Sequence, residues 1–187
     1  MKLKLLFVIL VLCSTYAFSQ TKNNISVVYG YNANAVNIHG AIGDYGYYDK
    51  TGQSYGLSYT RSFSELFSVE TGLLYSNNKV ELVTIGPAGG QYSGEIHMIS
   101  VPALAKITFL KYLYGEAGMV FDHQTNYKTD GIVDSQSGVG AEVGVGGQYK
   151  VGPVSIFLNP YYISHRFSGG RNNLEEAGVK FGLGYNF

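Results

Sequence analysis

The chain ends in KFGLGYNF, residues 180–187, where polar residues or glycine alternate with large apolar side chains. Because successive side chains of a β-strand point to opposite faces of a sheet, this pattern predicts a strand with one apolar and one polar face. The apolar face carries Val179, Phe181, Leu183, Tyr185 and Phe187. The polar face carries Gly178, Lys180, Gly182, Gly184 and Asn186. An apolar outside with a polar inside is typical of a barrel that crosses a lipid bilayer, and an amphipathic strand of a soluble sandwich is the alternative.

The first residues carry the pattern of an export signal. Two early lysines precede an apolar run over residues 5–13, and residues 17–19 (AFS) give the small-x-small pattern that precedes signal-peptidase cleavage. We therefore expect residues 1–19 to be a signal peptide for Sec-type export and residues 20–187 to form one mature domain. The only cysteine, Cys13, lies in the segment removed, so we expect no disulfide and no cysteine-based metal site in the mature chain.

The composition is unusual for a soluble domain, with 25 Gly, 17 Tyr, 10 Phe and no Trp. Tyrosine suits a membrane interface, and glycine suits tightly coiled strands and a crowded lumen. No apolar segment approaches the roughly 20 residues that a spanning helix needs, so a membrane protein of this sequence must be a closed barrel. Loss of Lys2 and Lys4 with the signal leaves 11 basic against 13 acidic residues, a formal charge of −2, which gives no electrostatic case for nucleic-acid binding.

Eight segments repeat the alternation of the last strand. They cover residues 25–36, 53–62, 67–76, 95–108, 113–121, 139–150 and 154–163, followed by the terminal strand. Each is close to the roughly 9–11 residues of a tilted membrane crossing. Pro102 lies inside the fourth segment, and because proline removes a ladder donor we expect a local bulge there.

The connections between these segments alternate in length. Short ones fall near residues 62–66, 109–112 and 151–153, and long ones near residues 37–52, 77–94, 122–138 and 164–174. Outer-membrane barrels have short periplasmic turns and longer outside loops, with both termini in the periplasm when the strand number is even. The sequence therefore predicts an all-β protein, an eight-stranded antiparallel up-and-down transmembrane β-barrel preceded by a cleavable signal peptide.

Three stretches resemble a known family: VETGLLYS at 69–76, ISVPALAK at 99–106 and the terminal strand. The chain resembles the small eight-stranded outer-membrane barrels of Gram-negative bacteria, OmpX-like and OmpA-barrel-like, and especially the PorT-like group called outer membrane protein beta-barrel domain. This resemblance implies an integral protein of the outer membrane in the cell envelope, with lipid as its main partner, and in most such proteins no reaction.

The terminal strand also resembles the signal that the barrel-assembly machinery reads. The matching residues are Lys180, Gly182, Tyr185 and Phe187. The resemblance implies the assembly machinery and periplasmic chaperones as partners during biogenesis. We expect the inserted barrel to be a monomer.

Several charged residues fall on the predicted inner face. They are Glu70, Glu116, Glu142 and Lys180, with Lys106 and Arg61 depending on the bulge. An eight-stranded interior is about filled by its own side chains, and an unpaired buried charge is costly. We therefore expect these acids and bases to pair in a plugged polar lumen. The alternative is a gated path through the same residues, which would make the protein a small porin-like channel for ions or small solutes.

Four histidines lie at or beside different long connections: His39, His97, His123 and His165. Imidazole is a common metal ligand, but the spacing shows no pair such as H-x-x-x-H. We expect neither a metal site nor another cofactor.

An enzymatic role is the second alternative, as a lipid-modifying barrel. Barrel enzymes that trim lipid A carry a His-x-Ser pair with a downstream Glu, and the nearest match is HQTN at 123–126, where Thr125 replaces the serine. HRFS at 165–168 has the wrong spacing, and Asp122 beside His123 gives only adjacency for a protease-like couple. We expect no catalysis.

The predicted outer loops are rich in Gly, Asn, Tyr and Asp, notably DYGYYD at 44–49. Recognition usually depends on loops held by a rigid scaffold, and tyrosine gives contact area at small entropic cost. We therefore expect a structural or surface-interaction role for the barrel, although the residues name no loop partner.

Overall fold

The computed structural model describes residues 23–38, 45–48, 50–84, 91–126, 135–165 and 172–187. These residues form β-strands joined by short turns. The strands are β1 (Asn23–Ile38), β2 (Tyr45–Tyr48), β3 (Lys50–Ser62), β4 (Phe67–Thr84), β5 (Gln91–Phe109), β6 (Leu113–Gln124), β7 (Gly138–Val151), β8 (Val154–Ser164) and β9 (Asn172–Asn186). Within the described residues, no helix is long and apolar enough to cross a membrane.

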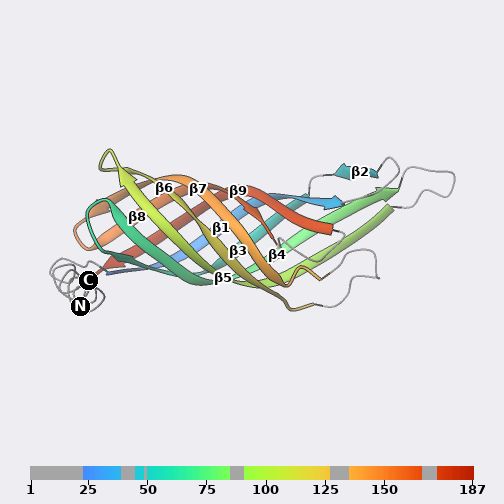
Figure 1. Ribbon diagram of the computed structural model, residues 1–187, viewed down its shortest axis with the longest axis horizontal. Helices are drawn as coiled ribbons and strands as arrows, with labels where there is room; N and C mark the ends of the chain where they lie inside the picture. The colour runs from blue at the N-terminus through green and yellow to red at the C-terminus, as the bar shows by residue number, and fades with distance from the viewer. Residues whose placement is uncertain (1–22, 39–44, 49, 85–90, 127–134, 166–171) are drawn as a thin grey trace, which may run out of the picture.

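Eight of these strands close into a ring. Figure 1 shows the resulting barrel from the side. Following the hydrogen bonds, the order is β4, β3, β1, β9, β8, β7, β6 and β5, and a further β4–β5 ladder closes the sheet. Every pairing in the ring is antiparallel. The predicted eight-stranded up-and-down barrel is therefore confirmed.

The first and last strands meet at one seam of the ring. The amide of Asn23 donates to the carbonyl of Phe187 at 2.9 Å, and the amide of Phe187 donates to the carbonyl of Asn23 at 2.8 Å. This seam lies at the same end as the β3–β4, β5–β6 and β7–β8 turns, which we call the turn end. The opposite end is the loop end.

The loop end contains more strand than the sequence analysis predicted. β4 continues to Thr84 and β5 begins at Gln91, so residues 77–84 and 91–94 are strand rather than loop. β2 pairs with β4 beyond the β3–β4 ladder, in a segment that was also predicted to be loop. The prediction was wrong here because the alternation reverses at this end, where apolar side chains point inward and polar side chains point outward. A strand defined by apolar outward residues therefore ends, in the sequence, where the reversal begins.

Pro102 causes no bulge, which corrects the expectation of a local bulge within residues 95–108. The β4–β5 ladder pairs Thr71 with Ala103 on one side of the proline and Leu74 with Ser100 on the other, with equal numbers of residues between them on both strands. The ladder skips two pairs, Gly72 with Pro102 and Leu73 with Val101, and resumes in the same register. Loss of one donor therefore interrupts a ladder without inserting a residue.

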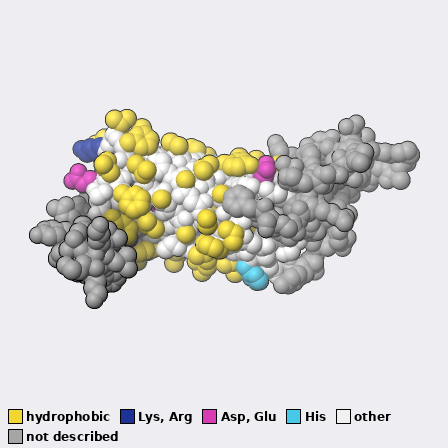
Figure 2. Space-filling view, in the orientation of Figure 1, with side chains coloured by type: hydrophobic (Ala, Val, Ile, Leu, Met, Phe, Trp, Pro, Cys, Tyr) yellow, Lys and Arg dark blue, Asp and Glu magenta, His cyan; other side chains and the backbone are white. Residues whose placement is uncertain are grey.

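The membrane-facing and interior faces follow the predicted alternation. On β1 and β9 the outward side chains of Val27, Tyr29, Phe181 and Leu183 are exposed, whereas the inward residues between them are buried. Figure 2 shows hydrophobic side chains over the visible wall of the barrel, with charged side chains near its ends. Such an exposed apolar band, roughly 25 Å tall in outer-membrane barrels, is suited to lipid.

Inward glycines make room for large lumen side chains, as the composition suggested. A Cβ atom on Gly182 would lie 2.0 Å from the ring of Phe157, and one on Gly146 would lie 2.6 Å from the ring of Tyr114. Both contacts are far shorter than van der Waals distances. The two aromatic rings can therefore lie across the lumen only because the neighbouring strand carries glycine.

The β5–β6 turn is backbone-strained. Leu110 and Lys111 have φ of 51° and 62°, in the left-handed region that side chains other than glycine, asparagine and aspartate rarely adopt. The amide of Tyr112 donates to the carbonyl of Leu110 at 2.6 Å, which closes a three-residue turn around Lys111. In the β7–β8 turn the same region of φ is taken by Gly152, at 58°.

Candidate functional site in the barrel interior

Nearest the turn end, one lysine joins two carboxylates across the lumen. Lys106 of β5 lies 2.5 Å from Glu70 Oε2 of β4 and 3.3 Å from Glu116 Oε2 of β6. The hydroxyl of Thr60 donates to the same Glu70 oxygen at 3.0 Å. All three charged side chains are almost fully buried. We call Lys106, Glu70 and Glu116 the lower cluster.

Two aromatic rings cover the lysine of the lower cluster. Its Nζ lies 4.2 Å from the ring centre of Tyr114 and 5.7 Å from that of Phe157. Tyr114 has no exposed surface. A cation over a ring face is attracted by the ring quadrupole, so these rings stabilise Lys106 while they fill the cross-section.

A second ion pair lies further into the barrel. Lys180 of β9 bonds the carboxylate of Glu142 on β7, and its Nζ lies 4.4 Å from the ring centre of Tyr161 on β8. Asn159, which lies directly opposite Lys180 in the β8–β9 ladder, donates its side-chain amide to Glu116 of the lower cluster. Glu142 is fully buried. Charged side chains from five strands therefore lie in two neighbouring groups at successive levels of the lumen.

A histidine bridges two carboxylates toward the loop end. His165 Nδ1 lies 2.7 Å from Asp122 Oδ2, and its Nε2 lies 3.0 Å from Glu176 Oε1. His165 follows the last residue of β8 and so lies outside the spanning strand. Burial alone would lower the pKa of this imidazole, but the adjacent carboxylates of Glu176 and Asp122 outweigh burial and raise the pKa to about 10. The imidazolium is therefore a third buried cation at neutral pH.

The interior becomes apolar beyond this histidine. Five buried aliphatic side chains from β1, β4, β5 and β9 pack together, and we call them the apolar seal: Val36, Val80, Ile96, Met98 and Leu174. The side chain of Gln136 is buried beside it and accepts a hydrogen bond from the amide of Leu174 at 2.9 Å. Here the inside is apolar, as in a soluble barrel, whereas the levels below carry the buried ion pairs beside a smaller apolar cluster of Val120, Tyr161 and Ile163.

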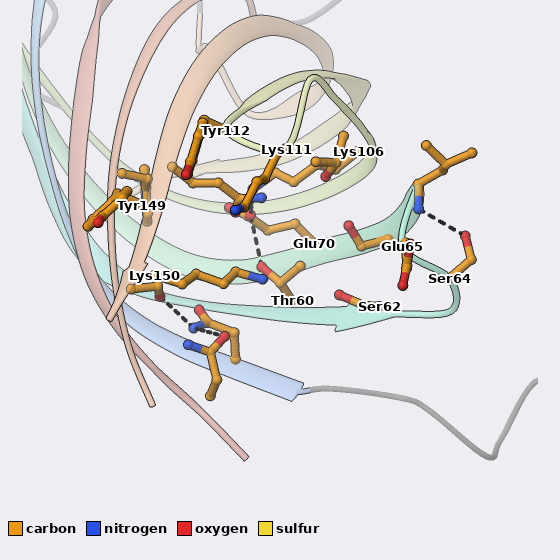
Figure 3. Close-up of a pocket in the computed structure, with 18 of the residues that line it drawn as sticks. Thr60, Ser62, Ser64, Glu65, Glu70, Lys106, Lys111, Tyr112, Tyr149 and Lys150 are labelled. Carbon is orange, nitrogen blue, oxygen red and sulfur yellow. Dashed lines mark hydrogen bonds and ion pairs between the residues drawn. The ribbon is translucent and has the colours of Figure 1, made fainter. Parts of the chain in front are cut away.

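The turn end, by contrast, is open. A cavity of about 1230 Å³ extends inward from the three turns, and we call it the turn-end cavity. Glu70 and Lys106 lie at its inner limit, as Figure 3 shows, with Thr60 and Ser62 on one wall and Lys111 and Lys150 near its mouth. The lumen is therefore accessible from the turn end and closed above the lower cluster.

The structure places all four predicted lumen charges inside the barrel. Glu70 and Glu116 meet at Lys106, which is also inside, and Glu142 meets Lys180. Arg61 instead lies over the ring of Phe63, 5.7 Å from its centre.

Sequence reasoning missed three interior residues, Asp122, His165 and Glu176. Extending the alternation beyond the predicted strand ends would have placed Asp122 and Glu176 on the inner face, because they share the parity of Glu116 and Lys180. The same extension along the segment 154–163 would have placed His165 inward, because it lies an even number of residues from the buried Asn159 and Tyr161.

The proposed assembly residues occupy both faces of β9. Tyr185 and Phe187 are outward and exposed, whereas Lys180 and Gly182 are inward and buried. This arrangement leaves the aromatic pair accessible from outside the barrel.

The histidines lie apart from one another. His97 and His123 are on outward faces, His165 is inside, and His39 lies outside the described residues. Among the residues that the structure describes, no group of three or more His, Cys, Asp or Glu side chains could hold a metal ion. Both ring nitrogens of His165 already face carboxylates, so neither offers a lone pair to a metal.

The residues considered for catalysis do not converge. Asp122 points inward to His165, whereas the next residue, His123, is exposed on the outside. The hydroxyl of Thr125 donates to the carbonyl of His97 at 3.2 Å. Residues 166–168 lie outside the described part of the chain, as do Asp44 and Asp49 of the tyrosine-rich stretch, whose residues 45–48 form β2.

Comparisons with known proteins agree with this architecture. The sequence profile described as Outer membrane protein beta-barrel domain matches residues 5–187. No curated protein matches the chain. The solved structure of the outer membrane protein OprG from Pseudomonas aeruginosa is similar, with 14% identity and a TM-score of 0.57 over 89% of this chain and 95% of that chain.

Two further solved structures match at lower TM-scores. Ail, the attachment invasion locus protein of Yersinia pestis, has 19% identity and a TM-score of 0.43 over 88% of this chain and 99% of that chain. The N-terminal β-barrel domain of OprF from Pseudomonas aeruginosa has 15% identity and a TM-score of 0.46 over 90% of this chain and 100% of that chain.

Proposed function

This chain belongs to the outer membrane protein beta-barrel domain family, and we propose that it acts as a closed barrel with a structural or surface-interaction role. It is an integral protein of the outer membrane. The turn end then faces the periplasm and the loop end faces outward, as in other barrels of even strand number.

The observation that carries the proposal is the closure of the lumen at successive levels. A solute from the periplasm meets first the lower cluster, then Lys180 with Glu142, then His165 with its carboxylates, and last the apolar seal. Removing one partner of a buried pair costs about 3–5 kcal/mol, so a path that separated these charges would be strongly unfavourable. This closure supports a scaffold rather than a pore.

Biogenesis and partners follow from the same proposal. Residues 1–19 direct Sec-type export and are cleaved before Gln20, and the folded barrel is a monomer whose main partner is outer-membrane lipid. Periplasmic chaperones deliver the chain, and the assembly machinery recognises Tyr185 and Phe187 in the last strand. No catalytic role is part of this proposal.

Single-channel conductance tests the closed lumen. The mature chain is refolded, its folding is checked by comparing boiled and unboiled samples on a gel, and it is added to a planar bilayer. We expect a folded barrel without current steps. Reproducible steps from the folded wild-type protein would contradict closure.

The turn-end cavity favours a second candidate function, a small channel that is shut at its outer half. It is a cavity of about 1230 Å³ that extends from the turn end to Glu70 and Lys106 of the lower cluster. Under this alternative, opening the apolar seal by Ile96→Gly with Leu174→Gly should produce current, whereas in a structural barrel the ion pairs beneath would still block it. Conductance of this double variant therefore separates the two functions.

A further inference from the structure

The outer wall of the barrel changes from apolar to polar along β4 and β5. On the side toward the turn end, the outward side chains next to the transition are Leu73 and Ile99, which are exposed. On the side toward the loop end, they are Lys79 and Glu95, also exposed. Tyr75 and His97 lie between these two groups. In a membrane this transition lies at the level of the lipid headgroups of the outer leaflet, which rests on the orientation given under the proposed function.

The side chains at the transition form a connected array. Tyr75 Oη lies 2.5 Å from His97 Nδ1, and His97 Nε2 lies 3.4 Å from Glu95 Oε2. A neutral imidazole with its proton on Nε2 satisfies both contacts, since it accepts from the tyrosine and faces the carboxylate with an N–H. The array therefore fixes the orientation of the imidazole and holds it beside the glutamate.

The backbone around this histidine is held by the residues after β6. The amide of His97 donates to Asn126 Oδ1 at 2.9 Å, and Asn126 Nδ2 donates to the carbonyl of Glu95 at 2.6 Å. The amide of Thr125 donates to the carbonyl of His97 at 2.8 Å. Each polar group of this array is therefore positioned by a partner, which is how a preorganised binding surface is built.

Polar side chains at the same place remain exposed and can bind a ligand. The side chains of His97 and Glu95 are 28% and 49% exposed. Lys79 lies directly opposite Glu95 in the β4–β5 ladder, and Asn77 lies directly opposite His97. The side-chain oxygen of Asn77 is buried without a hydrogen-bond partner among the described residues. A carboxylate, an ammonium group and an imidazole thus lie together on one open strip of wall.

An aromatic and aliphatic surface continues directly below this strip. The ring of Tyr55 lies 5.4 Å from that of Tyr75, and both face outward above Leu57 and Leu73. A ligand that covers both parts must have a polar head and an apolar chain. Among molecules in a bilayer, that description fits a lipid.

We propose that Tyr75, Lys79, Glu95, His97 and Asn126 form a binding site for the sugar headgroup of an outer-leaflet glycolipid, and we call it the glycolipid site. Glu95 accepts hydrogen bonds from sugar hydroxyls, and Lys79 donates to their oxygens. The acyl chains lie along the apolar wall below. The headgroup chemistry is that of a sugar rather than a bare phosphate, because a carboxylate opposite an ammonium group matches the mixed donors and acceptors of sugar hydroxyls, whereas Glu95 would repel a phosphate that approached Lys79.

The test measures lipid retention by the refolded mature barrel. Folded protein is transferred to micelles that contain equal amounts of glucosyl diacylglycerol, phosphatidylglycerol and phosphatidylcholine, and bound lipid is identified by native mass spectrometry. We expect enrichment of the glucolipid on the wild-type barrel. Glu95→Gln and Lys79→Ala should each reduce that enrichment about tenfold, the effect of losing one hydrogen bond to a charged group.

Glu175→Gln is the matched control, because Glu175 is an outward glutamate on β9 outside the glycolipid site. It should retain the wild-type enrichment, and all variants should still show the folded band on an unboiled gel. Equal retention of the three lipids by the wild-type protein would overturn the proposal, and so would a preference for phosphatidylglycerol. Full competition by soluble methyl glucoside at millimolar concentration would also overturn it, because the site would then take a free sugar. These outcomes do not depend on whether the barrel conducts.

Discussion

Lys106 lies directly opposite Glu116 in the β5–β6 ladder, yet its shorter contact is with Glu70 on the other neighbouring strand, at 2.5 Å against 3.3 Å. The lysine therefore links three consecutive strands of the ring through one cation. Burial is tolerable for this charge only because both carboxylates and two aromatic rings surround it. The same principle governs Lys180 and His165, and it makes the lumen sensitive to changes in charge.

Replacing Lys180 by methionine should destabilise the barrel without opening it. The substitution leaves Glu142 as a buried carboxylate without its cation, which costs about 3–5 kcal/mol. We expect a lower midpoint of urea unfolding in lipid vesicles and no current in a planar bilayer. The double variant Lys180→Met with Glu142→Leu should recover much of the loss, and an unchanged midpoint in the single variant would show that the pair contributes nothing.

Replacing Gly182 by alanine should also destabilise the barrel, through overpacking. The new Cβ would lie 2.0 Å from the ring of Phe157, and forcing extra carbon into a packed interior costs about 1–3 kcal/mol. Gly147→Ala is the control, because the nearest atom to its Cβ would be 3.8 Å away. Unfolding midpoints of the two variants should differ clearly, and equal midpoints would mean that the ring of Phe157 can move aside.

The β5–β6 turn should become more stable when its residues match its backbone. Leu110→Asn with Lys111→Gly places residues that tolerate positive φ at 51° and 62°, and we expect a gain of about 1 kcal/mol in unfolding free energy. Gly152→Ala imposes the reverse change at φ 58°, where no atom lies within 4 Å, so its expected loss is conformational alone. Stabilisation by both changes, or by neither, would contradict this account.

Stability should fall as the pH rises from about 6.5 to about 10. The usual pKa of histidine is about 6.5, whereas in the folded barrel the pKa of His165 is about 10. Between these values the folded state binds a proton that the unfolded state does not, so the contribution is full below pH 6.5 and is lost by pH 10. His165→Gln should have a shallower fall over this interval, and parallel profiles of the two proteins would exclude His165 as the cause.

Deleting Phe187 should reduce the amount of barrel in the outer membrane. The deletion removes both backbone hydrogen bonds to Asn23 and an exposed terminal aromatic ring. Phe187→Tyr keeps both features and should insert as the wild type does. Quantification in purified outer membranes is the measurement, and normal levels of the deletion variant would remove Phe187 from the assembly signal.

The spanning part of the barrel was predictable because a strict physical contrast shapes it. From Ile25 to Tyr31 and from Val179 to Phe187, each side chain faces either lipid or the lumen, and the two environments select opposite residues. That contrast placed Glu70 and Lys180 in the lumen without a structure. The pairing of Lys106 with Glu70 depends on side-chain reach across the lumen, which alternation does not encode.

The loop end was less predictable because neither of its faces follows the apolar-out, polar-in alternation of the spanning strands. Val80 and Ile96 are apolar and point inward, whereas the apolar side chains of Leu73 and Val101 point outward.

The effect of Pro102 was misjudged for a different reason. The lost donor of Pro102 affects one of its two ladders, while the β5–β6 ladder continues through the pair of Pro102 with Val120.

The reciprocal hydrogen bonds between Asn23 and Phe187 set an order of events in barrel assembly. They join the first strand of the ring to the last, so the ring cannot close until β9 has reached the site of assembly. Every shorter chain is an open sheet with two unpaired edges, which must be shielded from other chains. The same contact places Asn23 and Phe187 within bonding distance, so a permuted gene that joins β9 to β1 and begins at another turn would encode the same ring.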